Sequence, residues 1–533
     1  MPIFKDIKAH FSTSSLTRGF PLLGLSLGPH DKEQVLFRGE NRSVITGYQG
    51  ELIVNCVSTE SIDVFFNAKS VAIYGASASQ NSVGSSIVQN FIKPQYTGKV
   101  YAVNPKYKQV LGIPCFPTLQ DIEDPVDLVI VAVPARITPR VFEDIAAKGV
   151  KASIIISGGF SETGAIGSEL EDEVVAIAKK HGIRIIGPNC IGVVDTLSHI
   201  DTFFLPEYRC GRPKPSNVAN ISLVSQSGAF AAAISDWTSE LGLGVSKLIS
   251  LGNKCDVDDD DLLCYLADDD STQVICYYTE GYDQDKGRTF FDQASKVTPH
   301  KPVLVVKSGR GQKAKAAASS HTGSLAGSDK VADAAYRQSG VIRVDNFEHM
   351  FDAAKALAMQ HAAKGDRVLM VTNGGGLGVM TTDALEAAGL AIPSPSKELA
   401  NIYKERLPAY CAIGNPIDVV GDANSTRYDI VFEEAIKSGE YDMFVVGMLL
   451  QTPSLSMEIT NVIANHQRQS GLPFVVVSMG GGFTTKAGEI MELMGVPTYA
   501  TGEKAALAAK GLAQYGEIKY GDEFNKTLIS EKP

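Results

Sequence analysis

The sequence predicts an α/β protein made of three consecutive doubly wound domains, Rossmann-like or flavodoxin-like, that follow an N-terminal extension. From about residue 66 onward, short runs rich in β-branched residues alternate with amphipathic stretches, a pattern typical of parallel sheets with helical crossovers. Successive runs lie roughly 25–30 residues apart, which leaves room for one helix in each crossover. At 533 residues the chain is also too long for a single hydrophobic core.

Composition excludes several classes of function. The chain has 60 acidic against 49 basic side chains and a net charge of -11, which argues against a nucleic-acid-binding surface. Its apolar runs are all far shorter than the roughly 18 residues that a membrane helix needs. The eight cysteines form no C-x-x-C pair and no Cys/His cluster with zinc spacing. We therefore expect no nucleic acid, no membrane and no metal site.

The extension, residues 1–61, differs in character from the rest. Residues 1–20 contain three basic residues against one acidic residue, together with the hydroxyl cluster at 12–15. Such a segment resembles a transit peptide, which would place the protein in the matrix of a mitochondrion or a related organelle. A peripheral extension of a cytoplasmic protein is the interpretation that we favour.

Each domain is assigned from its series of predicted strands. The first domain, residues 62–205, has strands at Val71–Tyr74, Val100–Val103, Leu128–Val133, Ser153–Ser157 and Arg184–Ile186. After a Pro-rich linker, the second domain, residues 216–362, has strands at Ile221–Ser225, Val245–Ser250, Val274–Thr279, Val303–Lys307 and Ile342–Val344. The third domain, residues 363–518, has strands at Val368–Thr372, Phe444–Leu449, Phe474–Ser478 and Pro497–Ala500.

Binding and catalytic residues are expected just after these strands, because ligands of doubly wound sheets bind beyond the carboxyl ends of the strands. The first strand leads into Gly75-Ala76-Ser77, a polar loop to Gly84 and a predicted helix, which together suit a diphosphate. The spacing G-x-G-x-x-G is absent, and the second strand ends in Asn104-Pro105-Lys106 instead of the acidic residue expected for NAD. A lysine there suits a ribose phosphate, so these residues leave CoA and NADP both open.

Other strand ends are small and polar. The third strand ends at Val133-Pro134, and the fifth leads into a loop with Asn189 and Cys190. Cys190 invites a nucleophile interpretation, but a small buried thiol is favoured. The tetrapeptide Ser225-Gln226-Ser227-Gly228 precedes a helix and fits either a phosphate cradle or an ordinary helix cap.

Among nine histidines, His321 stands out, because it lies in a loop of small residues, Ala316–Gly327, after the strand Val303–Lys307. Small neighbours leave an imidazole nitrogen open to attack phosphorus, although a hydrogen-bonding loop histidine fits the same pattern. Glu280 closes the strand Val274–Thr279 and is a candidate for holding the other ring nitrogen protonated. The acidic run Asp256–Asp261 lacks the spacing of a calcium loop, so we expect a solvated helix start.

Taken together, these strings resemble the NDP-forming acyl-CoA synthetase family, whose other well-known branch is succinyl-CoA synthetase. The resemblance covers about residues 62–518. It rests on YGAS (74–77), GPNCIG (187–192), SQSG (225–228), SLGN (250–253), YTEG (278–281), SHTGS (320–324), TNGGGLG (372–378) and NPID (415–418).

The resemblance implies an acid–thiol ligase that interconverts acyl-CoA, ADP and phosphate with a short carboxylic acid, ATP and CoA. It implies that His321 is transiently phosphorylated and that Glu280 supports it. The residues implied to bind CoA are Gly75, Ala76, Ser77, Gly84, Asn104, Lys106, Val133 and Pro134. Those implied to surround the acyl phosphate and phosphate are Asn189, Cys190, Ser225, Gln226, Ser227 and Gly228.

The third domain places the resemblance in the acetyl- or acyl-CoA branch, because α subunits of succinyl-CoA synthetase match only the first two domains. In the family, an ATP-grasp domain follows on the same chain or forms a separate β subunit. The sequence ends soon after the third domain, so we expect a separate β partner that carries the Mg-nucleotide in a hetero-oligomer. Two rival interpretations are a catalytically silent CoA-binding regulator of the same fold and an NADP oxidoreductase.

Overall fold

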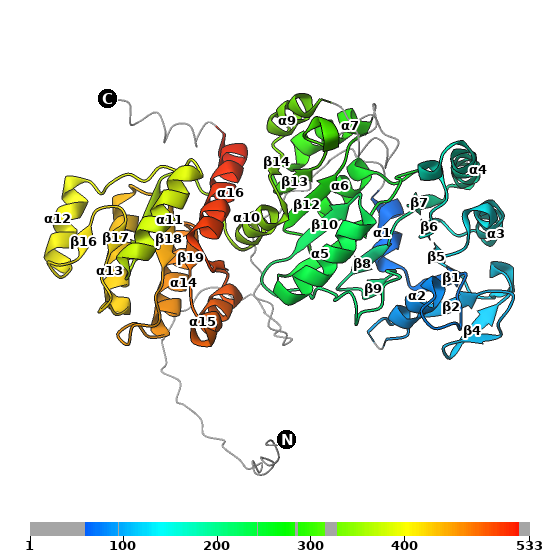
Figure 1. Ribbon diagram of the computed structural model, residues 1–533, viewed down its shortest axis with the longest axis horizontal. Helices are drawn as coiled ribbons and strands as arrows, with labels where there is room; N and C mark the ends of the chain where they lie inside the picture. Colours follow the sequence, from blue (N-terminus) through cyan, green and yellow to red (C-terminus); the bar gives the residue numbers. More distant parts are fainter. Residues whose placement is uncertain (1–58, 94, 242, 283–285, 315–327, 522–533) are drawn as a thin grey trace, which may run out of the picture. The chain divides into compact units, whose positions relative to one another are not determined.

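A computed structural model describes residues 59–521 except for 94, 242, 283–285 and 315–327. The predicted extension therefore lies almost wholly outside the described residues, as does His321 with its loop. The described part contains three mixed α/β sheets (Figure 1). Every strand expected from the sequence is present, so the predicted fold class is confirmed.

The first sheet has seven strands in the order β3-β4-β2-β1-β5-β6-β7, and every neighbouring pair is parallel except β3 and β4. Alternate side chains of β1 point to opposite faces: Val71 and Ile73 pack with α1 (Glu60–Asn67) and α2 (Val83–Phe91), whereas Ala72 packs with α3 (Thr138–Lys148) and α4 (Ala165–His181). The strands are β1 (Ser70–Tyr74), β2 (Lys99–Val103), β3 (Gln109–Val110), β4 (Ile113–Phe116), β5 (Leu128–Val131), β6 (Ala152–Ile155) and β7 (Arg184–Ile186).

The second sheet has the order β14-β13-β12-β10-β11-β8-β9. Ile275 and Tyr277 of β12 pack with α6 (Asp259–Asp268) and α7 (Lys286–Val297), and Cys276 on the opposite face packs with α5 (Gly228–Leu241) and α10 (Phe347–Met359). A further helix, α9 (Asp329–Gln338), contacts β14. The strands are β8 (Val193–Asp195), β9 (Ile200–Asp201), β10 (Ile221–Ser225), β11 (Val245–Ser250), β12 (Val274–Thr279), β13 (Val303–Lys307) and β14 (Ile342–Val344).

The third sheet has the order β16-β17-β15-β18-β19-β20. Helices α11 (Gly375–Ala387) and α15 (Gly482–Leu493) begin at the triple glycines that follow β15 and β19. The strands are β15 (Val368–Thr372), β16 (Ala412–Ile413), β17 (Ile417–Asp418), β18 (Met443–Gly447), β19 (Phe474–Val477) and β20 (Thr498–Tyr499). The remaining helices are α12 (Lys397–Arg406), α13 (Ser425–Ser438), α14 (Glu458–Ser470) and α16 (Gly502–Tyr520).

The strands that the sequence did not predict are β3, β4, β8, β9, β16 and β17, which are two to four residues long. A run this short carries too little period-two alternation to be recognised. Strands β8 and β9 fall within residues 62–205, yet β8 pairs antiparallel with β11 and therefore extends the second sheet.

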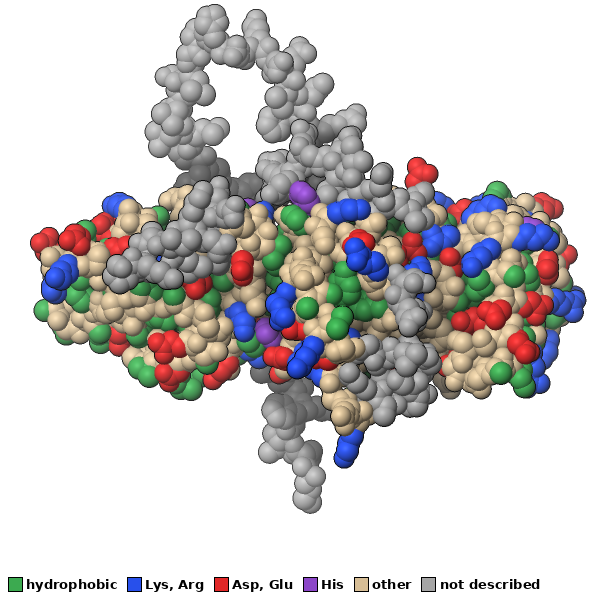
Figure 2. Space-filling model, turned by 90° about the horizontal axis from the view of Figure 1, so that it is seen from above, with side chains coloured by type: hydrophobic (Ala, Val, Ile, Leu, Met, Phe, Trp, Pro, Cys, Tyr) green, Lys and Arg blue, Asp and Glu red, His purple; other side chains and the backbone are tan. Residues whose placement is uncertain are grey.

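The outer surface carries charged side chains of both signs, as the composition indicates. Basic and acidic side chains are interspersed over the part of the face that is coloured in Figure 2. None of the helices among the described residues combines the length and the apolar character needed to cross a bilayer.

The acidic run Asp256–Asp261 does start a helix, but the prediction that it is solvated is wrong. Asp258 caps α6 by accepting a hydrogen bond from the Asp259 amide, and Asp259 is only 1% exposed. Its burial is possible because Lys254, five residues before it, pairs with it at 2.9 Å, while a cation from a distant part of the chain pairs with other residues of the run. Arg184 of β7 donates to Asp256 and to Asp261, each at 2.8 Å.

Replacing Arg184 with methionine should lower the free energy of unfolding by about 3 kcal/mol, because two largely buried carboxylates lose their partner. Denaturation in urea, followed by circular dichroism, measures this loss. Arg288→Met is the matched control, since Arg288 pairs with Asp292 in an exposed i,i+4 geometry and should leave stability nearly unchanged. Equal effects of the two substitutions would contradict the prediction.

Candidate active site between two sheets

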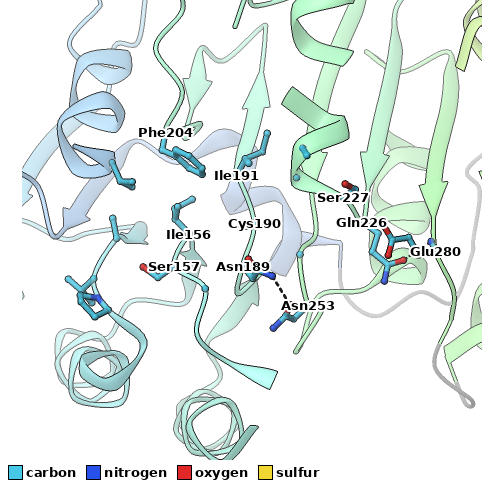
Figure 3. A pocket seen from close by; sticks show the side chains of 18 residues that line it. Ile156, Ser157, Asn189, Cys190, Ile191, Phe204, Gln226, Ser227, Asn253 and Glu280 are labelled. Atoms are coloured by element: carbon cyan, nitrogen blue, oxygen red, sulfur yellow. Dashed lines mark hydrogen bonds between the residues drawn. The ribbon is translucent and has the colours of Figure 1, made fainter. Parts of the chain in front are cut away.

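A cavity of about 690 Å³ lies where strand ends of the first and second sheets meet (Figure 3). Residues that follow β5, β6 and β7 line one side, and residues that follow β10, β11 and β12 line the other. This is the position at which ligands of doubly wound sheets bind. The lining consists of Val83, Ala132, Val133, Pro134, Ile156, Ser157, Gly158, Asn189, Cys190, Ile191, Phe204, Gln226, Ser227, Gly228, Ala229, Gly252, Asn253 and Glu280.

The glycine loop after β1 is tightly packed beside this cavity. Gly75 has φ of +94°, and a Cβ at this position would lie 2.4 Å from the carbonyl oxygen of Ala132. Gly84 in the first turn of α2 approaches the Gly75 carbonyl so closely that a Cβ there would lie 2.2 Å from it. These contacts bring the N-terminus of α2 to the cavity, where its first residue, Val83, forms part of the lining.

The other residues implied to bind CoA fall into two groups. Val133 and Pro134 line the cavity, whereas Gly75, Ala76, Ser77, Gly84, Asn104 and Lys106 do not. Asn104 supports the loop, because its Nδ2 donates to the carbonyl oxygen of Ala76 at 2.8 Å and its Oδ1 accepts from the Lys106 amide at 3.0 Å. Lys106 itself is exposed.

On the side of the second sheet, the SQSG turn places the start of α5 against the cavity. Ser225 is buried and does not line it; its hydroxyl donates to the carbonyl oxygen of Ser227 at 2.8 Å. Gln226, Ser227 and Gly228 line the cavity, so the first amides of α5 lie at its wall. No lysine or arginine belongs to this lining in the part of the chain that is described. An anion here would be held by backbone amides and a helix N-terminus.

Glu280 is the one charged side chain among the described lining residues. Its backbone N–H donates to Oε1 of Gln226 at 2.8 Å, and Figure 3 shows these two side chains close together. The next carbonyl, of Gly281, accepts from the Thr279 hydroxyl at 3.1 Å. Glu280 therefore lies between two peptide groups, Thr279–Glu280 and Gly281–Tyr282, that are each held by a hydrogen bond.

Two asparagines link the walls of the cavity. Nδ2 of Asn189 donates to Oδ1 of Asn253 at 3.3 Å (Figure 3), and Nδ2 of Asn253 donates to Glu162 at 2.7 Å and to Glu171 at 3.0 Å. Although burial acts in the opposite direction, the hydrogen bonds from Asn253 and from the Gly159 amide lower the pKa of Glu162. Glu162 therefore stays ionised and orients Asn253. Asn253 was visible in the sequence only as part of the string SLGN.

Cys190 lines the cavity as a buried thiol. It is a free cysteine whose Sγ donates to the carbonyl oxygen of Ile155 at 3.3 Å. Burial raises the pKa of this thiol to about 12, so the thiolate needed for a nucleophile is not formed near neutral pH.

An apolar part of the lining was not predicted from the sequence. Ile156, Ile191 and Phe204 contribute side chains to the cavity, and Figure 3 shows Phe204 and Ile191 near one another. Phe204 precedes the predicted linker and belongs to no motif that would mark it as a lining residue.

The described residues contain no metal site: their His, Cys, Asp and Glu side chains form no group arranged to hold an ion.

Three family models match the chain in sequence order. A CoA binding domain matches residues 69–196, a succinyl-CoA ligase like flavodoxin domain matches residues 218–357, and a ligase-CoA domain matches residues 368–518. The first two therefore contribute the opposite walls of the cavity.

Similar proteins include the acetate–CoA ligase [ADP-forming] I subunit alpha of Pyrococcus furiosus, which is 38% identical over 86% of this chain and 98% of that subunit. The acetate–CoA ligase [ADP-forming] I of Archaeoglobus fulgidus is also 38% identical, over 87% of this chain but 65% of that protein. Among solved structures, dinucleotide forming acetyl-coenzyme A synthetase 1 of Ca. Korarchaeum cryptofilum, in complex with phosphate and ADP, superposes with a TM-score of 0.78. It is 32% identical, and the match covers 89% of this chain and 99% of that chain.

The burial of Cys190 predicts that iodoacetamide leaves it unmodified in the native protein at mildly alkaline pH, because the thiol stays protonated and shielded. Mass spectrometry of the Cys190 peptide, before and after denaturation, measures the modification. Full alkylation is expected only after unfolding, and fast labelling of the native protein would contradict the prediction.

Proposed function

The chain belongs to the NDP-forming acyl-CoA synthetase family, and from that premise we propose that it is the α subunit of an ADP-forming acyl-CoA synthetase. The reaction converts acyl-CoA, ADP and phosphate reversibly into a carboxylic acid, ATP and CoA. The observation that carries the proposal is the cavity shared by the matched CoA-binding domain and the second sheet. It has helix amides for an anion at one wall and the carboxylate of Glu280, the one carboxylate of the described lining, nearby.

In the first step, an oxygen of inorganic phosphate attacks the thioester carbonyl carbon of acyl-CoA. The carbon–sulfur bond breaks, CoA leaves as the thiolate and takes up a proton, and acyl phosphate remains. The amides at the start of α5 stabilise the charge on phosphate, as helix N-termini do for anions. The Asn189–Asn253 pair lies across the cavity and is placed to orient the acyl group.

In the second step, an imidazole nitrogen of His321 attacks the phosphorus of acyl phosphate and releases the carboxylate. Glu280 accepts a hydrogen bond from the other ring nitrogen and so stabilises the charged phosphohistidine. An oxygen of ADP then attacks the same phosphorus, forms ATP and frees His321. Phosphoryl transfers of this kind depend on positioning and on charge stabilisation.

The Mg-nucleotide would be bound by an ATP-grasp β subunit. The extent of the matches supports this part of the proposal, because the chain covers 98% of a relative named as an alpha subunit and 65% of a single-chain ligase. Phosphohistidine formed on this chain would then deliver its phosphoryl group to ADP on the partner.

Replacing His321 with alanine should abolish net ATP formation from acetyl-CoA, ADP and phosphate in the presence of the β partner, because no phosphoryl acceptor remains. CoA binding should persist. A coupled assay measures ATP, and calorimetry measures CoA binding. His300→Ala is the matched control, since His300 is exposed at a helix end. Full ATP formation by His321→Ala would contradict the proposal, and a wild-type chain that binds CoA without turnover would support the regulatory alternative.

Replacing Gly75 with alanine should weaken CoA binding at least about tenfold, or about 1.4 kcal/mol. The added Cβ would meet the Ala132 carbonyl in a backbone conformation that disfavours side chains. Calorimetric titration with CoA measures the effect. Gly112→Ala is the control, because Gly112 has a similar φ of +90° with open space around it. Unchanged affinity in Gly75→Ala would contradict the role of this loop.

A further inference from the structure

The segment that follows β11 joins the two walls of the cavity. Its backbone donates three hydrogen bonds to the end of the first sheet: from Asn253 to Pro188 at 2.9 Å, from Cys255 to Gly187 at 3.1 Å and from Val257 to Ile185 at 3.0 Å. Lys254 lies in the middle of this segment. Its backbone has φ of +60°, which costs a residue other than glycine about 1 kcal/mol, so its surroundings must hold it there.

The side chain of Lys254 reaches the carbonyl of Gly281, the residue after Glu280. It is 5% exposed, and its Nζ lies 2.9 Å from Oδ2 of Asp259 and 3.4 Å from Oδ1 of Asp258. The same Nζ donates to the carbonyl oxygen of Gly281 at 3.4 Å. Nζ also lies 5.8 Å from the centroid of the Tyr282 ring. A single buried cation thus contacts the start of α6 and the residues just after Glu280.

The carbonyl of Gly281, the residue after Glu280, is consequently held from two directions. Thr279 donates to the Gly281 carbonyl from within β12, and Lys254 donates to the same oxygen from the segment between the sheets. On the other side, Gln226 accepts from the Glu280 amide. Rotation of the backbone on either side of Glu280 would break these contacts, so they restrict the position from which its carboxylate extends.

From this arrangement we infer that Lys254 is a positioning residue, which fixes the carboxylate of Glu280 relative to the wall formed by Asn253. The inference deepens the proposed function and rests on it. Lys254 acts through the Gly281 carbonyl. Because Lys254 lies in the segment that joins the two sheets, the position of Glu280 depends on the contact between these sheets.

Burying the ion pair of Lys254 and Asp259 costs desolvation free energy. A purely stabilising role therefore does not account for it. Burial raises the pKa of Asp259, although the ammonium of Lys254 acts in the opposite direction. Oδ1 of Asp259 is buried without a hydrogen-bond partner among the described residues. Buried ion pairs of this kind often contribute little net stability, whereas they do impose a defined geometry.

The matched control is a second buried lysine. Lys247 is 4% exposed and pairs with Asp269 at 2.6 Å and with Asp195 at 3.3 Å. It does not line the cavity. The test variant is Lys254→Met with Asp259→Asn, and the control is Lys247→Met with Asp269→Asn. Each double substitution removes one charge of each sign, and each leaves one further buried carboxylate, Asp258 in the test variant and Asp195 in the control, without that lysine, so the two variants are matched.

We expect kcat for ATP formation with the β partner to fall about 10- to 100-fold in the test variant, as misplacement of a site group does. KM for acetyl-CoA should change less than about threefold. The control should keep wild-type kcat even if its stability falls. Equal kcat in the test variant and the wild type would overturn the inference.

A triple variant that joins the test variant to Glu280→Gln shows whether Lys254 acts through Glu280. The triple variant should be no slower than Glu280→Gln alone, because residues that act as one unit are not additive. Independent, multiplicative losses would overturn the inference.

Hydrogen exchange separates this inference from the proposed function. Amide exchange of Glu280 and Gly281 should be faster in the test variant than in the wild type and the control, whatever reaction the protein catalyses. Unchanged exchange would overturn the positioning role. Absence of ATP formation by the wild type would overturn the proposed function instead.

Discussion

The three backbone hydrogen bonds between Asn253–Val257 and Ile185–Pro188 are the constraint on which the cavity depends. They hold the carboxyl ends of the parallel strands of two sheets against each other, and each sheet supplies one wall. Gly252 allows the approach, because a Cβ there would lie 2.1 Å from the Pro188 carbonyl. The ion pairs of Arg184 with Asp256 and Asp261 reinforce the same junction. A reaction that uses residues of both sheets is possible only because these contacts hold the two walls of the cavity together.

The electrostatics of the cavity follow from the elements that form it. Its described lining contains one carboxylate and no basic side chain, so an anionic group must be bound by the amides of α5 and by asparagine and glutamine side chains. Buried charges lie just behind this lining, where Glu162 orients Asn253 and Lys254 reaches Gly281. Fixed dipoles in a low-dielectric site stabilise a migrating phosphoryl group without reorganisation.

Much of this arrangement was predictable from strand-end positions alone. Val133, Gln226 and Glu280 each follow a buried run of β-branched residues, so the rule for parallel sheets placed them at one edge. The thiol of Cys190 was also correctly interpreted as buried. The third domain was recognised from its series of strands, which the structure contains as β15, β18, β19 and β20.

The features that escaped prediction depend on partners far apart in the sequence. The acidic run was expected to be solvated because Arg184 lies more than seventy residues before it. The hydrophobic periodicity of a segment does not depend on such a contact and cannot predict it. Phe204 was missed for the same reason. Lys254 pairs with Asp258 and Asp259, four and five residues away, and only its contact with Gly281 spans a longer separation. The roles of His321, Glu280 and the CoA-binding residues come from resemblance and from geometry together, and they remain proposals.

The central claim is that this chain itself accepts a phosphoryl group on one histidine. The most direct measurement is to incubate the purified chain alone with acetyl phosphate and to map the phosphorylated peptide by mass spectrometry under alkaline conditions. We expect a single acid-labile phosphate on His321. Phosphate on another residue, or none on a chain that forms ATP with its partner, would contradict the claim.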